Sequence, residues 1–321
     1  MFQIPNKDMN VTVRCDFESP YREMGAIRRA LCPDEEEDIP EDDELDIFAV
    51  SVPHLETSAR MIEIPCVVEI TRRNDESRQP DDKMNLQYLF YYIHYLFLIM
   101  NVSVPGSCNF SEAIVKLDQP ISNRDWTDEI EFRTFNLNSA LFVNATRYCR
   151  EYFEITSVDI NQTKKWMEKY NMGLNSYAQS EVEKVLYSLL NCCMNSNVYA
   201  REYNVYTISN VVWLANAIEA FYLKGRGPRE RYKSARSLLQ KKLPLFFKTV
   251  PKNVLEENLK NFYDIRNKFV HGNEELLLYH PLEGFSRSNF MTYFDSMNFV
   301  FALLLSTVQK LVSEDKYSVV C

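Results

Sequence analysis

Residues 253–272 indicate the fold of the C-terminal half of the chain, because signals for both ends of one helix lie within NVLEENLKNFYDIRNKFVHG. Asn253 can cap a helix, and Glu256 has the spacing of a capping box relative to it. Gly272 can adopt the left-handed conformation that ends a helix. Between these ends, apolar side chains recur at helical spacing and form one stripe: Leu255, Leu259, Phe262, Ile265 and Phe269. The sequence therefore predicts an amphipathic helix over residues 254–271.

Four further segments around this helix have helical patterns: 180–193, 207–223, 228–239 and 289–313. The second of them is apolar on nearly every side, so it should be a central helix, and it contains Glu219. Pro228 can open the third helix, and Pro244 and Pro251 lie in the connection that follows it. We therefore expect an all-α bundle of four to five helices over residues 170–321.

Residues 1–165 have a different pattern, with β-branched runs at 11–16 and 47–71 that are typical of strands. Between these runs, residues 34–46 contain ten acidic side chains and no basic one, which is typical of a loop or a disordered insert. We expect a mixed α/β sensor or regulatory domain over 1–165. The expected fold class of the whole chain is therefore α+β, with the helical bundle after the mixed region.

Residues 86–100 read LQYLFYYIHYLFLIM, the closest approach of this sequence to a membrane segment. The segment is shorter than the roughly 20 residues that span a bilayer, and its tyrosines, Gln87 and His94 need polar partners. It should therefore form a buried core helix. A membrane-associated sensor is the alternative that this segment leaves open.

Composition limits the chemistry that this chain can perform. The net charge of −9 argues against diffuse coating of nucleic acid and leaves binding to local patches. The seven glycines form neither a GxGxxG nor a P-loop motif, which disfavours dinucleotide and P-loop chemistry. The eight cysteines lack metal-ligand spacing, and the first ten residues lack the features of a secretory signal. We expect a cytoplasmic protein with free thiols, no metal and no cofactor.

Phe262 to Gly272, FYDIRNKFVHG, places an arginine, an asparagine and one of only four histidines in the last turns of the predicted helix. This Arg, four residues, then His, with Asn after the Arg and Val-His-Gly at the end, resembles the motif of HEPN (higher eukaryote and prokaryote nucleotide-binding) domains. The preceding segments ANAIEAFYL, 215–223, and RYKSARSLL, 231–239, resemble the Apea-like branch of that family. The resemblance covers roughly residues 175–315.

The resemblance implies a metal-independent endoribonuclease in which two protomers form one composite active site. Arg266 and His271 would be catalytic, and Asn267 would support the geometry of the motif. Such domains are often toxins or abortive-infection effectors. The resemblance thus implies RNA, including tRNA, as substrate, a homodimer or higher homo-oligomer, and a phage-derived trigger acting at the N-terminal domain.

The residue types suit cleavage of RNA by its own 2′-hydroxyl. Histidine can move a proton near neutral pH, and arginine stays charged and presents a planar fork to phosphate oxygens. Residues five apart on a helix point about 140° from each other, so a long arginine or a second subunit must bring the two groups together. Asn267 and His271 share a face and can contact each other. The alternative is that Arg266 makes a surface ion pair and His271 interacts only with the helix dipole.

Ten basic residues lie between 224 and 252, against one acid, Glu230. They can bind RNA phosphates, and we expect five of them to do so: Arg229, Lys233, Arg236, Lys241 and Lys242. Arg229, Lys233 and Arg236 would share a helical face. Glu219 and Tyr263 are expected to support the site, and the resemblance implies that Glu219 is a buried carboxylate that pairs with a basic residue or with Arg266. The alternative is that Glu219 lies at a helix edge in water. The alternative reading of the basic segment is a solvated helix face.

Two hypotheses about function follow. The first is an antiphage ribonuclease, in which the acidic segment 34–46 could occupy the basic surface until a trigger displaces it. The second is a non-catalytic HEPN module that binds nucleic acid or a nucleotide, or dimerises.

Overall fold

The computed structural model describes the chain in ten segments. They are residues 2–5, 9–15, 66–72, 82–116, 130–172, 177–194, 208–224, 230, 233–271 and 287–318. The chain divides into two compact units, Met1–Asn85 and Leu86–Cys321. The expected boundary between residues 165 and 170 therefore falls inside the second unit. The acidic segment 34–46 and most of the expected strand region 47–71 lie outside the described residues.

The first unit contains a three-stranded antiparallel sheet of β1 (Phe2–Pro5), β2 (Met9–Cys15) and β3 (Cys66–Arg72). In the ladder between β2 and β3, Val11 is opposite Ile70 and Val13 is opposite Val68. β-branched residues on both strands favour this pairing. The strand pattern at 11–16 is therefore confirmed, as is the last part of the pattern at 47–71.

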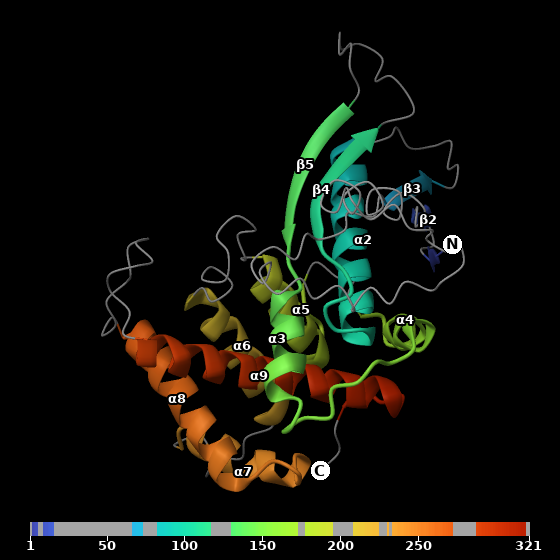
Figure 1. The fold of residues 1–321 in the computed structure, drawn as a ribbon. Coiled ribbons are helices and arrows are strands. Elements are labelled where there is room, and N and C mark those ends of the chain that lie inside the picture. Colours follow the sequence, from blue (N-terminus) through green and yellow to red (C-terminus); the bar gives the residue numbers. More distant parts are fainter. Residues whose placement is uncertain are drawn as a thin grey trace, which may run out of the picture. The chain divides into compact units, whose positions relative to one another are not determined.

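The second unit contains the remaining elements (Figure 1). In chain order they are α2 (Asp82–Ser103, its first turn in the first unit), β4 (Phe110–Lys116), β5 (Ile130–Leu137), α3 (Ala140–Cys149), α4 (Ile160–Lys169), α5 (Glu181–Met194), α6 (Ile208–Tyr222), α7 (Ala235–Phe246), α8 (Lys252–Val270) and α9 (Arg287–Ser313). β4 and β5 pair with each other as an antiparallel hairpin.

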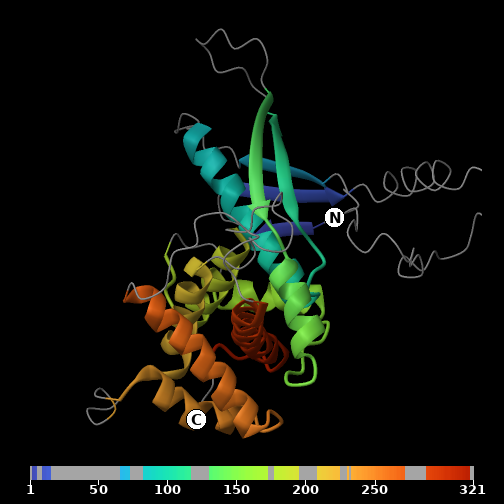
Figure 2. The same cartoon turned by 60° about the vertical axis from the view of Figure 1, so that its left-hand side comes forward.

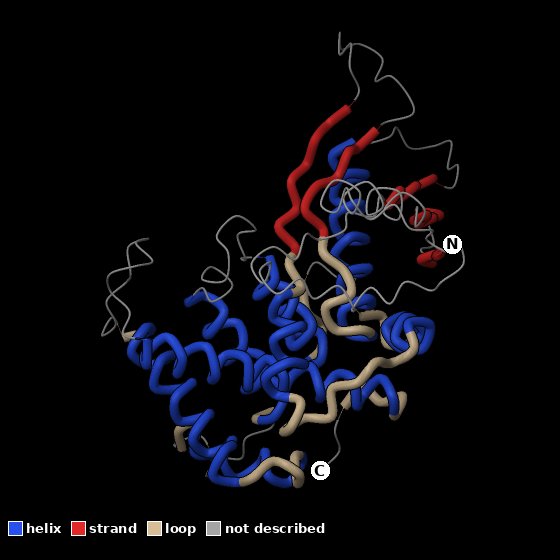
Figure 3. Tube along the Cα trace, viewed as in Figure 1, coloured by secondary structure: helices blue, strands red, loops and turns tan. Residues whose placement is uncertain are grey.

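The expected fold class, with a mixed α/β region before an all-α bundle, is wrong. Of the residues whose side chains are described, 73% are helical, in eight helices. Figure 3 shows the helices in blue and the strands in red. α2, α3 and α4 lie in the region that we expected to be mixed, and their side chains belong to the same core as the later helices. The assignment was wrong because two β-branched runs, at 11–16 and 47–71, were taken to represent the secondary structure of all 165 residues.

α9 is the central helix of the second unit. It contacts α3, α4, α5, α6 and α8, and nearly all its side chains from Met297 to Val312 are buried. Figure 2 shows α9 nearly end-on, with α3 and α8 packed against it. One helix among the described residues, Thr292–Ser313 within α9, is long and apolar enough to cross a membrane. Within it, 89% of the apolar 18-residue stretch that meets this criterion is buried inside the structure. That degree of burial is typical of a core helix.

α2 confirms the expectation of a buried core helix for residues 91–100, the part of the segment whose side chains are described. Tyr95, Phe97 and Ile99 have no exposed surface. Gln309 joins α9 to this helix: its amide nitrogen donates to the carbonyl oxygens of Val102 at 2.8 Å and of Thr156 at 2.7 Å. The backbone N–H of Thr156 donates to the amide oxygen of Gln309 at 3.2 Å. One buried side chain thus satisfies three backbone groups.

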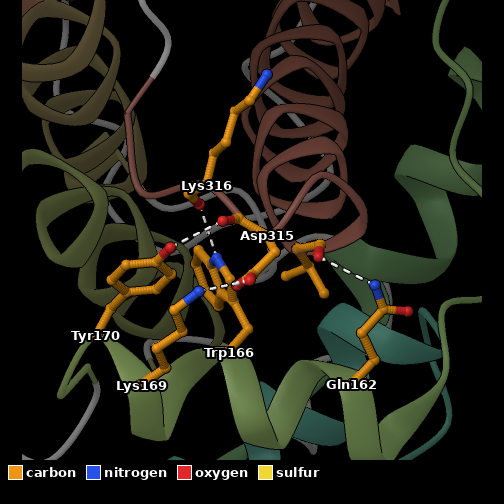
Figure 4. Close-up of polar contacts among 7 residues, drawn as sticks. Gln162, Trp166, Lys169, Tyr170, Asp315 and Lys316 are labelled. Carbon is orange, nitrogen blue, oxygen red and sulfur yellow. Dashed lines mark hydrogen bonds and ion pairs between the residues drawn. The ribbon is translucent and has the colours of Figure 1, made fainter.

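The end of α9 is held against α4 by polar contacts (Figure 4). The indole N–H of Trp166 donates to the backbone carbonyl oxygen of Lys316 at 2.7 Å. The hydroxyl of Tyr170 donates to the backbone carbonyl oxygen of Asp315 at 2.8 Å. Lys169 forms an ion pair with the carboxylate of Asp315. Asp315 has a φ of 51°, the left-handed conformation that often ends a helix.

The helix ends differ from those expected. α7 begins at Ala235, where the hydroxyl of Ser234 accepts from the backbone N–H of Ser237 at 3.3 Å, and it continues through Pro244 to Phe246. Pro228, which was expected to open this helix, lies outside the described residues. α8 begins after Pro251, which makes no side-chain cap, so Asn253 lies inside the helix and does not cap it.

Candidate functional site

α8 carries the motif and is anchored to the bundle by the first part of its apolar face. Leu255, Leu259 and Phe262 have no exposed surface, as the predicted stripe requires, whereas Ile265 and Phe269 are only half-buried. α8 packs along α9 and α6, and its last two turns leave the core. The C-terminal end of the helix is therefore rigidly held at its base and open to solvent at its tip.

Arg266, Asn267 and His271 lie at this tip. Arg266 is half-buried, and its Nη1 donates to the side-chain oxygen of Asn267 at 3.1 Å. His271 is exposed and ends the helix, with its backbone N–H donating to the carbonyl oxygens of Asn267, at 3.0 Å, and Phe269. Asn267 thus contacts both motif residues, but it meets His271 through the backbone and not through the expected amide–imidazole contact.

Arg266 and His271 make no direct contact in the described part of a single chain. The predicted separation of about 140° around the helix is the reason. Neither side chain forms an ion pair with a carboxylate among the described residues, so the surface ion pair considered for Arg266 is not formed there. Both groups remain accessible to a ligand or to a second chain.

Tyr263 and Glu219 join the motif helix to α6. The hydroxyl of Tyr263 donates to a carboxylate oxygen of Glu219 at 3.1 Å. Tyr263 is buried, and Glu219 is half-buried. The expected pair between Glu219 and Arg266 is not formed, because Arg266 turns to Asn267. Tyr263 is the described side chain that contacts Glu219 in place of Arg266.

Four of the seven described basic residues of the basic segment, 224–252, form ion pairs with nearby acids, Lys252 with Glu256 among them. Arg236 pairs with Asp264 on α8 at 2.9 Å, and Lys242 lies 3.8 Å from Glu230. Lys224 pairs with Glu181 at 2.7 Å, and this hydrogen bond lowers the pKa of the Glu181 carboxyl. Two of the five expected RNA-binding cations are therefore already partnered.

Of the other three expected cations, Lys233 and Lys241 are exposed and form no ion pair with a described carboxylate, and Arg229 lies outside the described residues. Lys233 precedes the start of α7 at Ala235, so it cannot share a helical face with Arg236 as we expected. Lys241 lines a shallow depression of about 480 Å³ between α7 and α8. Its other lining residues are Ser237, Gln240, Pro244, Lys252 and Glu256.

Exposed apolar side chains lie at the same end of the bundle as the motif. Tyr222, the last residue of α6, packs against Phe246 just before α8 begins, so α6 and α8 run in opposite directions (Figure 1). The start of α6 therefore lies beside the end of α8. There, Val212 and Trp213 on α6 are 41% and 37% exposed, and Val270 on α8 is 48% exposed.

Comparisons with protein-family models, with curated proteins and with solved structures found no match to this chain. Among the described residues, no group of three or more His, Cys, Asp or Glu side chains is arranged to hold a metal ion. Cys192 and Cys193, which are adjacent in α5, are fully buried, and burial raises the pKa of both thiols. They are core residues, as expected.

Proposed function

We propose that this protein is a metal-independent endoribonuclease of the HEPN type, with Arg266 and His271 as its catalytic residues. The observation that carries the proposal is the tip of α8, where an arginine and a histidine without carboxylate partners in the described structure stand on one anchored helix end. RNA cleavage by the 2′-hydroxyl needs proton transfer and stabilisation of negative charge, which these two side chains can supply.

The roles of the three motif residues follow from their contacts. His271 removes the proton from the 2′-hydroxyl or delivers one to the leaving oxygen. Arg266 has five N–H donors, of which the contact with Asn267 uses one, so the remaining donors can bind the phosphate. Asn267 restricts the guanidinium to one orientation, which lowers the entropy lost when the phosphate binds.

The proposed ribonuclease would act as a homodimer, because Arg266 and His271 of one chain point apart. We propose that a second copy packs on Val212, Trp213 and Val270 and brings its own motif to the first, in a dimer or a higher homo-oligomer. Apolar side chains exposed together at one end of a bundle favour association. A Trp213→Glu variant should then be monomeric and inactive, while Leu245→Glu, at the 68% exposed Leu245 of α7, should remain dimeric.

The biological setting rests on the family resemblance alone. We propose cytoplasmic cleavage of RNA, including tRNA, as an abortive-infection response, started by a phage-derived trigger that acts on the N-terminal unit.

The second candidate is a non-catalytic HEPN module that dimerises or holds nucleic acid or a nucleotide. One observation favours it: the depression between α7 and α8 is lined by neither Arg266 nor His271. In this case Arg266→Ala and His271→Ala would weaken association or binding, and no RNA would be cleaved.

The experiment that separates the two candidates is incubation of total RNA and of tRNA with purified full-length protein in EDTA. The wild type should produce fragments and His271→Ala should not. Lys260→Ala, at an exposed lysine of the same helix, is the matched control and should cleave like the wild type. The ribonuclease would be contradicted if the wild type left the RNA intact in every condition. These conditions include the addition of phage-derived candidates for a trigger that acts on the N-terminal unit.

A further inference from the structure

A second surface depression, of about 570 Å³, lies at the end of α3. It is open to solvent and is lined by Arg147, Tyr148, Arg150 and Glu151. The opposite face of α3 is buried, with Phe142 and Ala145 fully covered and Cys149 4% exposed. The buried face fixes the helix on the bundle, so its last turn holds Arg147 and Tyr148 toward solvent, and Arg150 follows directly after it.

Contacts with two neighbouring side chains hold the ring of Tyr148 in a fixed orientation. Its ring meets the ring of Phe294 of α9 edge-on, with 5.1 Å between centroids and 78° between planes. The guanidinium of Arg147 lies over the Tyr148 ring at 5.6 Å from the centroid. Even so, 46% of Tyr148 remains exposed. A large aromatic ring that is both oriented and accessible is a platform for stacking.

The two arginines carry charge that the described structure does not neutralise. Arg147 and Arg150 are exposed, and neither forms an ion pair with a described carboxylate, in contrast to Arg236 and Lys242 on the basic segment. The carboxylate of Glu151 also lines the depression, and its interaction with the hydroxyl of Tyr152 raises the pKa of Tyr152. The surface therefore offers two planar phosphate-binding groups beside one stacking platform.

We propose that Arg147, Tyr148 and Arg150 form a binding site for a single-stranded nucleic acid. One unpaired base stacks on Tyr148, and the phosphates on either side of it bind the two guanidinium groups. That this strand is the RNA substrate rests on the proposed ribonuclease function. Stacking tolerates any base, so the site selects unpaired strands over duplexes and does not read sequence.

The test measures binding of a fluorescent RNA of about ten adenines to full-length His271→Ala, which leaves the probe intact if His271 is catalytic. In this background, Tyr148→Leu should weaken binding about tenfold, because one stacked base is lost. Tyr148→Phe keeps the ring and should bind like its parent. An RNA duplex of the same length has no unpaired base, so its binding should not respond to Tyr148→Leu.

A second variant tests the arginines independently of the packing of Tyr148. The double variant Arg147→Gln/Arg150→Gln should make the negative slope of log affinity against log salt shallower by about 1.4, because each single-strand phosphate contact contributes about 0.7 to its steepness. Lys165→Gln/Lys184→Gln removes the same charge from exposed lysines of α4 and α5 and should leave the slope unchanged.

Three results would overturn the inference: no binding of the single strand at about 50 mM salt, equal loss for strand and duplex in Tyr148→Leu, or an equal effect of the lysine control. The ribonuclease proposal is judged separately, by cleavage with the wild type in EDTA. If the wild type cleaves RNA and Tyr148→Leu leaves the binding of the single strand unchanged, this site alone is refuted. Tyr148-dependent binding without any cleavage would refute the ribonuclease alone.

Discussion

Tyr263 on α8 donates a hydrogen bond to the carboxylate of Glu219 on α6, with 3.1 Å between the two oxygen atoms. The bond lies two turns before His271, at the last point where α8 is buried. It therefore fixes the direction in which the exposed tip of the helix leaves the core. A hydrogen bond to a charged group in a partly buried position is stronger than one at the surface.

A double-mutant cycle on this pair should show coupling. Tyr263→Phe and Glu219→Ala should each destabilise the protein, and together they should cost roughly 1–2 kcal/mol less than the sum of the two. Urea unfolding measures the three variants and the wild type. Tyr263→Phe combined with Glu257→Ala, at an exposed acid of the same helix, should be additive. Additivity in the Glu219 cycle as well would show that the bond contributes nothing.

Asp264→Asn should increase the affinity for RNA while changing stability little. It releases Arg236, whose ion pair with Asp264 has side chains that are 40% and 45% exposed, so the pair contributes less than about 1 kcal/mol to folding. Affinity should rise roughly two- to fivefold, and the slope of log affinity against log salt should steepen by about 0.7. Fluorescence anisotropy over a salt series measures both. Glu257→Gln removes an equal charge from α8, and an identical response from it would show that Arg236 has no special part.

Gln309→Leu should be among the most destabilising single substitutions in the second unit. Leucine fills the same space but leaves the carbonyl oxygens of Val102 and Thr156, and the N–H of Thr156, without their partner. Gln309 is 3% exposed, so water cannot replace it without rearrangement. A loss of about 2–4 kcal/mol is expected in urea unfolding. Gln162→Leu, which loses one hydrogen bond from an exposed glutamine of α4 to the carbonyl oxygen of Val312, should cost less. The reverse order would contradict the assigned role of Gln309.

His94 of α2 should make stability fall in mild acid. Burial lowers the pKa of its imidazole from 6.5, because the charged form is disfavoured in the folded chain. Protonation therefore favours the unfolded state, so the contribution of His94 is complete above pH 6.5 and is lost as the pH falls below it. His94→Gln should lose less stability than the wild type between about pH 7.5 and pH 5. Parallel pH profiles for the two proteins would contradict this assignment.

The positions of the C-terminal helices could be predicted because helical periodicity is a local signal. The stripe of α8 was found, and Leu255, Leu259 and Phe262 are buried as it requires. The start of the helix was missed, because Pro251 has a fixed φ near −57° that leads into a helix without a side-chain cap. Asn253 had the right residue type, but it lies two residues after the cap position at Pro251.

Contacts between helices could not be predicted from patterns along the chain. The motif at Arg266 and His271 was visible because its spacing lies within one helix. The pairing of Arg236 with Asp264 depends on how α7 lies on α8, and it removes a cation that was expected to bind RNA. The turn at Arg147–Arg150 was missed because α3 has only ten residues. Its signal was an aromatic residue between two arginines, next to the short apolar run at 140–143.

The central claim is that the tip of α8 cleaves RNA without a metal, and the initial rate of cleavage in EDTA at one mapped RNA bond tests it most directly. His271→Ala should lower this rate by at least about 100-fold, because a positioned proton-transfer group contributes that much or more. The wild type should leave the bond intact when the nucleotide on its 5′ side lacks the 2′-hydroxyl. A His271→Ala rate equal to that of the wild type, or cleavage of the 2′-deoxy substrate at the normal rate, would contradict the claim.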